Sequence, residues 1–241
     1  MKAIFVFIIL WGLCFGAKAQ SSFFSGDDLN YAVIKDTDKY VNIREDPNSH
    51  SAILGRINKY NVFSCQTNKS NWWKVLCIEY DSNHKPFWLQ GFIHKSRVSF
   101  LTKWMTIKKE NVYNDSCVFK NDDLIAVVKK TSFISNKHKI IKKSQDLLLI
   151  DGKGFWGTDG EIPKSSISKL RLIIKGKSII IPNNAFNDLY EPRFKTLSIC
   201  FGPENTIYVS MSNSDGAGAY TIIWIFKDNK YFSRYIDDSM V

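Results

Sequence analysis

The sequence predicts an all-β protein: a small SH3-like barrel, then a mixed, mainly antiparallel β domain. Short alternating apolar runs are separated by polar turns about every ten residues. Two hairpin turns are well marked, at Lys175-Gly176-Lys177 and at Lys227-Asp228-Asn229-Lys230. The only helix-like piece, residues 184–189, is short and is followed by Pro192, which cannot continue a helix.

Residues 1–19 have the composition of a secretory signal peptide. Lys2 precedes a continuous apolar run over residues 3–16, and Ala17-Lys18-Ala19 supplies the small residues of a cleavage site before Gln20. The run is too short to span a bilayer comfortably, and the residues before Cys14 do not fit a lipidation pattern. We therefore expect export to the periplasm or the exterior, with no transmembrane segment in the remaining chain.

The remaining chain is basic. Lys2 and Lys18 leave with the signal peptide, so the 33 Lys and Arg become 31 against 23 acids, a net charge of +8. This charge suits a polyanionic neighbour such as cell wall, although solubility alone also accounts for it. Export argues against nucleic acid as a partner. Residues 129–143 hold six Lys and one His, and here we favour a solvated face over a polyanion-binding strip.

Four cysteines remain after the signal peptide, and export permits disulfides. Cys65 and Cys77 flank one predicted hairpin, which favours a bond between them and leaves Cys117 to pair with Cys200. The alternative is four buried thiols that pack as small apolar residues. The cysteine spacing and the scattered histidines do not fit a zinc site, and we expect neither a metal nor a cofactor.

Residues 38–103 form the first predicted domain. Val41 and Ile43 alternate with polar neighbours, and further apolar runs follow at residues 53–57, 62–63 and 72–78. Residues 20–37 precede this domain as a lead-in or as a first short strand at residues 31–34. No Gly-, Ser- or Pro-rich linker follows Leu101, so we expect the first domain to dock on the second, at residues 104–241.

Five segments in order resemble the bacterial SH3-like (SH3b) family. They are Asn42-Ile43-Arg44, Asp46-Pro47, Ile53-Leu54-Gly55, Asn71-Trp72-Trp73-Lys74-Val75 and Gly91-Phe92-Ile93. The resemblance covers about a quarter of the chain. Asp46 and Phe92 depart from the family's Gly and Trp. The resemblance implies a small barrel with a shallow aromatic groove that binds peptidoglycan or a partner peptide.

On this analogy five residues line the groove. Aromatic rings pack on sugar or peptide faces, whereas Arg and Asp bind the charged ends of a peptide. Successive strand residues point to opposite faces, so either Trp72 or Trp73 belongs to the core. A loop at residues 81–86 projects Trp88 beside Trp72 and Trp73. The predicted ligand-binding residues are Tyr40, Arg44, Asp46, Trp73 and Trp88.

The second domain contains eight candidate strands and two glycine-rich loops. Residues 152–157 fit G-x-G-x-x-G, but residues 158–163 cannot start the helix that a dinucleotide site requires. The loop at residues 151–163 is either a turn network with Trp156 as a lid on the core or an exposed recognition loop of Trp156, Asp159 and Glu161. The loop at residues 212–219 is best explained as a hairpin loop. The candidate strands are residues 124–128, 146–150, 169–174, 178–181, 197–201, 207–211, 220–226 and 231–236.

Catalytic motifs are absent from the sequence as printed. No cysteine has a peptidase-type motif with a suitable downstream histidine, and neither H-E-x-x-H nor G-x-S-x-G occurs. We therefore predict a non-catalytic binding protein of the cell envelope. The alternatives are an inhibitor or immunity protein that blocks an exported hydrolase through its C-terminal loops and, third, a cell-wall enzyme of unfamiliar type.

Overall fold

The computed structural model describes residues 29–35, 37–80, 86–142, 148–214 and 216–238. The predicted signal peptide, residues 81–85 of the predicted loop before Trp88 and the start of the candidate strand at 146–150 lie outside these ranges. The predicted all-β class is confirmed, because the described chain folds into strands joined by loops and by three-residue 3-10 turns. None of the described helical segments is long and apolar enough to cross a membrane.

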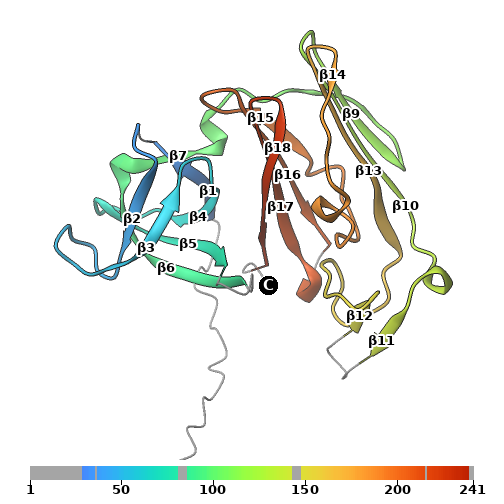
Figure 1. The fold of residues 1–241 in the computed structure, drawn as a ribbon, viewed down its shortest axis with the longest axis horizontal. Coiled ribbons are helices and arrows are strands. Elements are labelled where there is room, and N and C mark those ends of the chain that lie inside the picture. The colour runs from blue at the N-terminus through green and yellow to red at the C-terminus, as the bar shows by residue number, and fades with distance from the viewer. Residues whose placement is uncertain (1–28, 36, 81–85, 143–147, 215, 239–241) are drawn as a thin grey trace, which may run out of the picture.

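The first unit is a curled antiparallel sheet of seven strands (Figure 1). The segment that the sequence leaves as a lead-in or a first strand is a strand, and it pairs with β4 and β7 inside this sheet. The spatial order is β3 (Ile53–Asn58), β2 (Tyr40–Arg44), β6 (Pro86–His94), β5 (Trp72–Tyr80), β4 (Phe63–Gln66), β1 (Leu29–Ile34) and β7 (Val98–Phe100).

Alternation along these strands builds the core of the first unit. Ile43, Ile57 and Ile93 point inward and are fully buried with Phe63 and Val75. The glycine of the Gly-Phe-Ile segment has a steric role. A Cβ at position 91 would lie 2.5 Å from the main-chain oxygen of Arg44, so only glycine lets β6 pair this closely with β2.

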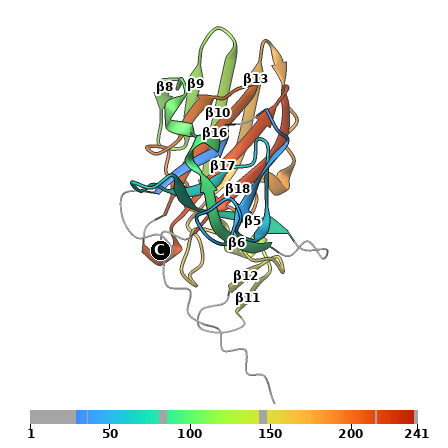
Figure 2. The same cartoon turned by 90° about the vertical axis from the view of Figure 1, so that its left-hand side faces the viewer.

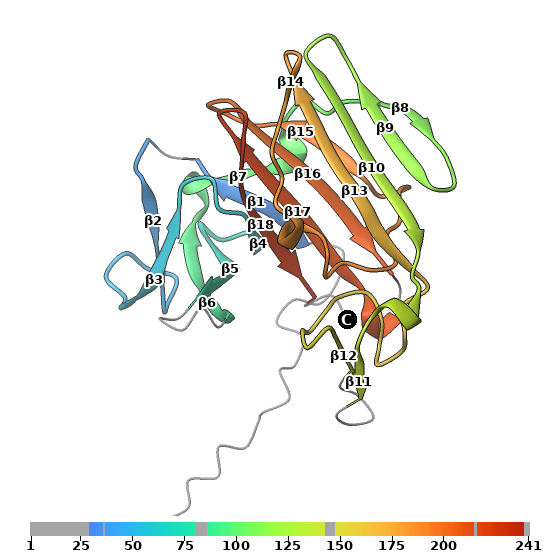
Figure 3. The same cartoon turned by 45° about the vertical axis from the view of Figure 1, so that its right-hand side comes forward.

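The rest of the chain forms two larger sheets and one small hairpin (Figure 3). Every named strand pairing is antiparallel, and the isolated Trp156–Leu189 bridge is parallel. The five-stranded sheet has the order β14 (Lys177–Ser178), β13 (Ser165–Ile174), β10 (Leu124–Ser132), β9 (Ser116–Lys120) and β8 (Lys109–Val112). The four-stranded sheet is β15 (Ser198–Phe201), β16 (Thr206–Asn213), β17 (Tyr220–Lys227) and β18 (Lys230–Asp237), and the hairpin is β11 (Ile140–Lys142) and β12 (Leu148–Ile150).

Both predicted hairpin turns are confirmed. β13 and β14 are joined through Lys175 and Gly176, and β17 and β18 through Asp228 and Asn229. All four residues have positive φ, as a two-residue type I′ turn requires. The strand predicted at residues 178–181 is wrong after its first residue, since β14 ends at Ser178 and Ile180 is 90% exposed. The sequence also missed β8, β9 and β11, whose apolar patterns are short.

The four-stranded sheet is the middle of three layers: Figure 1 shows it between the first unit and the five-stranded sheet, and in Figure 2 the first unit lies in front of it. One face of β17 presents Ile222 and Trp224 to the core shared with β10 and β13. The other face presents Ile223 and Ile225 to a second cluster with Val33 of the first unit. Every residue of β17 except the last is therefore buried, which explains its continuous apolar sequence.

The two units are docked, as the missing linker predicts. Buried Ser64 of β4 donates a hydrogen bond to the Asp237 carboxylate at 2.6 Å, and its hydroxyl lies 2.7 Å from the Tyr235 hydroxyl. At the rim, Lys59 pairs with Glu204 at 2.5 Å. Hydrogen bonds from Lys59 and then Tyr60 lower the pKa of the Glu204 carboxyl.

The predicted disulfides are wrong, since all four cysteines within the described chain are buried thiols. Cys65 lies directly opposite Val75 rather than Cys77, which itself lies opposite Leu89. Cys117 belongs to the core between the two larger sheets, whereas Cys200 belongs to the cluster between the units. The alternative interpretation, small apolar packing groups, therefore holds.

Candidate functional site

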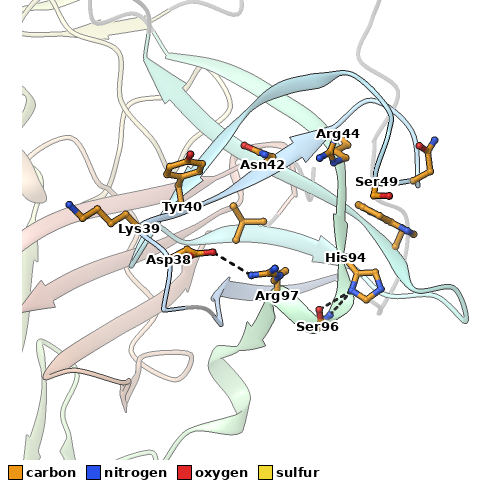
Figure 4. Close-up of a pocket in the computed structure, with 12 residues that line it drawn as sticks. Asp38, Lys39, Tyr40, Asn42, Arg44, Ser49, His94, Ser96 and Arg97 are labelled. Carbon is orange, nitrogen blue, oxygen red and sulfur yellow. Dashed lines mark hydrogen bonds and ion pairs between the residues drawn. The ribbon is translucent and has the colours of Figure 1, made fainter.

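A cationic aromatic groove lies on the first unit, with a volume of about 970 Å³. Four segments frame it: β2 with the residue pair before it, the β2–β3 loop, the start of β5, and the junction of β6 with the 3-10 turn η1 (Lys95–Arg97) (Figure 4). Its lining residues are Asp38, Lys39, Tyr40, Val41, Asn42, Arg44, Asn48, Ser49, Trp72, His94, Ser96 and Arg97.

Aromatic rings lie at both ends of this groove. Tyr40 is 40% exposed, and the Arg56 guanidinium lies 4.2 Å from the centre of its ring. At the other end Trp72 and His94 are cross-strand partners, and their rings meet edge to face at 5.4 Å. The His94 ring is held by Ser96, whose hydroxyl lies 2.8 Å from Nδ1. Both ends therefore offer an amphipathic ring surface to a ligand.

The charge of the groove is positive. Lys39, Arg44 and Arg97 outnumber the one acid, Asp38, which lies 3.6 Å from the Arg97 guanidinium (Figure 4). The side-chain oxygen of Asn42 is buried and accepts no hydrogen bond from any described residue. An excess of cations suits a ligand that brings a carboxylate to the groove.

Of the five predicted ligand-binding residues, Tyr40 and Arg44 line the groove. Arg44 also holds the β2–β3 loop, since its guanidinium donates to the main-chain oxygen of Ser51 at 2.7 Å. Asp46 is not among the lining residues. It closes the same loop by accepting from the Ser51 hydroxyl, while its own N–H donates to that hydroxyl at 2.8 Å. Asp46 therefore shapes the edge of the groove without facing it.

Trp73 belongs to the core rather than to the groove. Its ring stacks on Phe100 at 5.5 Å, and its indole N–H donates to the main-chain oxygen of Asn68 at 3.2 Å. Trp72 points to the opposite side, into the groove. From the sequence, one of the two Trp residues must belong to the core, but the sequence does not decide which one. Buried Ile93 is the cross-strand partner of Trp73, which fixes both faces.

The other ten lining residues were missed by the sequence analysis, among them Lys39, Asn42, Trp72, His94 and Arg97. The alternation of β6 was the available signal for one of them. Ile93 belongs to an apolar position, so His94 must point to the other face, where Trp72 lies. Lys39 and Arg97 carried no such signal, because they lie just outside strands.

Trp88 lies in a second hollow, of about 390 Å³, between the two units. The same hollow is lined by Trp156, which the sequence places in a possible recognition loop. Trp156 is half-buried, packs against the large core and pairs through its main chain with residues 188–190. Of the two interpretations of this loop, the position of Trp156 matches the lid on the core.

Asp159 and Glu161 line a third hollow, of about 530 Å³, where the two glycine-rich loops meet. No helix follows the G-x-G-x-x-G segment, in agreement with the rejection of a dinucleotide site. A Cβ on Gly218 would lie 2.8 Å from the main chain of Thr158, so the loops touch through their backbones. The residues of the predicted recognition loop thus lie in two separate hollows.

The thiols lack the environment of a catalytic nucleophile. Burial raises the pKa of Cys65 and of Cys200 to about 12, and it also raises the pKa of Cys117. Reactive cysteines have a lowered pKa instead. The described residues contain no group of three or more His, Cys, Asp or Glu side chains that could hold a metal ion.

Comparison with known proteins gave no match: no family model, curated protein or solved structure matches this chain.

Proposed function

We propose that this chain is an exported, non-catalytic binding protein of the cell envelope. Its groove on the first unit takes an extended peptide, either the peptide of peptidoglycan or a segment of a partner protein. The observation that carries the proposal is the combination of aromatic ends and an excess of cations in one open groove. The order of segments that resembles bacterial SH3-like domains adds to it.

Each part of the groove has a counterpart in such a ligand. A free carboxylate pairs with Arg44 or Lys39, because guanidinium and ammonium groups form strong charge-assisted hydrogen bonds. Tyr40 and Trp72 pack on the apolar parts of the ligand.

The inhibitor function has less support. It relies on an exposed loop that inserts Trp156 into a hydrolase, whereas Trp156 packs on the core and its main chain is bonded to Asp188 and Tyr190. An enzyme of unfamiliar type also has less support, since the raised pKa values of three thiols disfavour cysteine chemistry. The binding function is therefore our conclusion.

The test is sedimentation of the purified protein with insoluble peptidoglycan at low and at high salt. We expect Trp72→Ala to weaken retention at least about tenfold, because the groove loses one aromatic end. Phe87→Ala is the matched control, since Phe87 is 46% exposed on the neighbouring strand β6 and does not line the groove. Trp73→Ala should instead lower the free energy of unfolding by about 3 kcal/mol.

Retention that persists at high salt in the wild type and is lost in Trp72→Ala would support a specific groove, because simple attraction between exposed charges is screened. Wild-type retention that vanishes in high salt would contradict binding of peptidoglycan by the groove. Equal losses in the Trp72 and Phe87 variants would contradict it as well. A partner peptide would then be sought by crosslinking from a photoreactive group at Tyr40.

A further inference from the structure

The outer face of the five-stranded sheet carries a fixed group of cations that the groove does not use. Inward positions of β10 and β13, such as Ala126 and Leu172, are buried in the core. Strand alternation therefore directs the intervening residues away from the core. On β9, β10 and β13 these outward positions include Val118, Lys120, Ile125, Val127, Lys129, Lys169, Arg171 and Ile173.

Two of these cations are direct cross-strand partners. Lys129 of β10 lies opposite Lys169 of β13, and both are exposed. Arg171 is opposite Val127, one outward position further along, so it is the diagonal neighbour of Lys129. Like charges that face each other on adjacent strands destabilise a sheet. The fold therefore keeps an arrangement that lowers its own stability.

No acid on this face offsets the repulsion. The outward positions of β9, β10 and β13 include no Asp or Glu. Lys129, Lys169 and Arg171 form no ion pair with any described residue. The acids of this sheet lie at its borders, on the edge strand β8 and in the turns between strands, at Glu110, Asp115, Asp122 and Asp123. In Figure 3 no other labelled element lies over β9 and β10.

We propose that this outer face binds a linear polyanion, a polymer with repeated phosphate or carboxylate groups. The cations belong to a sheet whose other side is the core, so little ordering of the backbone is required when a ligand binds. An anionic chain laid across Lys129, Lys169 and Arg171 would remove their mutual repulsion. It would also displace small counterions, which favours binding at low salt.

A polymer fits this face better than a lipid surface does. The apolar outward residues Val118, Ile125, Val127 and Ile173 are half-buried rather than exposed. Binding to a bilayer grows with the apolar area that inserts into it, and these side chains offer little. The face also lies on the far side of the molecule from the first unit (Figure 1), so the proposal is independent of the groove.

The experiment measures binding of the purified protein to inorganic polyphosphate, to poly-glutamate and to vesicles that contain phosphatidylglycerol, over a salt series. The test variant is Lys129→Ala/Lys169→Ala/Arg171→Ala. The control variant, Lys69→Ala/Lys108→Ala/Lys195→Ala, removes the same charge from exposed positions elsewhere on the surface. Thermal unfolding of both variants is measured in parallel.

We expect the test variant to bind at least one polymer about tenfold more weakly at low salt, with a shallower salt dependence, and the control to change less than about twofold. The test variant should unfold at the same temperature as the wild type or higher, because a like-charge pair is gone. Binding to only one of the two polymers would identify the anionic group as phosphate or as carboxylate. Equal losses in both variants, or binding to vesicles but to neither polymer, would overturn the proposal.

Discussion

At the scale of single residues, glycines decide where the chain contacts itself. Gly157 has φ of +119°, and a Cβ there would lie 2.5 Å from the main-chain oxygen of Tyr190. It is the last glycine of the G-x-G-x-x-G segment, and the absence of a side chain there serves packing. Gly154, three residues earlier, has open space around its Cβ position and no positive φ. The fold therefore requires glycine at position 157 but not at position 154.

This difference makes a prediction. Gly157→Ala should lower the free energy of unfolding by about 2 kcal/mol or more, because the substitution is strained in backbone conformation and clashes with Tyr190. Gly154→Ala should leave stability unchanged or raise it slightly, since alanine restricts the unfolded chain. Urea unfolding of both variants measures the effect. Similar stabilities for the two would argue against the close contact between residues 157 and 190.

At the scale of elements, β17 organises the larger part of the molecule. Its two faces belong to two different cores, so the strand carries apolar side chains at consecutive positions. A sheet with one face in water would show alternation instead. β10 is such a strand, with buried Leu124, Ala126 and Val128 alternating with more exposed neighbours.

Adjacent residues of β17 should therefore be equally sensitive to truncation. Ile222→Ala and Ile223→Ala should each cost about 2–5 kcal/mol of unfolding free energy, because each leaves a cavity in a fully buried site. Ile125→Ala on β10 is the comparison and should cost clearly less, since Ile125 is only half-buried. A small cost for Ile223→Ala beside a large one for Ile222→Ala would mean that the first unit does not cover this face in solution.

At the scale of the whole molecule, three layers share two interfaces. The second interface joins the first unit to the four-stranded sheet through apolar packing and through the buried Ser64, Tyr235 and Asp237. A buried carboxylate is costly unless hydrogen bonds satisfy it. The hydrogen bond from Ser64 therefore offsets part of the cost of burying Asp237 at this interface. The groove and the cationic sheet face lie on the two outer layers.

We expect the protein to unfold in one cooperative transition, and Ser64→Ala to lower its unfolding free energy by about 1–3 kcal/mol, since the Asp237 carboxylate loses a donor. Ser168→Ala, at an exposed position, should have almost no effect. Far-ultraviolet circular dichroism and tryptophan fluorescence should report the same midpoint in urea. Two separate transitions would show that the units fold independently.

The sequence by itself determined the all-β class, both hairpin turns and most of the longer strands, because alternation and turn residues are local signals. It also limited the choice at Trp72 and Trp73 to one core residue. Short strands such as β8 and β11 were not predicted, since three or four residues are too few to show a clear alternation of apolar and polar side chains. The membership of the bacterial SH3-like family and the binding function stay predictions.

Only the tertiary structure decided which side chains meet. Trp88 and Trp156 share a hollow although they belong to different units, and Lys129 faces Lys169 across a strand pair forty residues apart. The thiols of Cys117 and Cys200 belong to separate cores, so they do not pair. Such contacts depend on register and on the packing of sheets, which arise from the sum of many weak interactions over the whole chain rather than from any local segment.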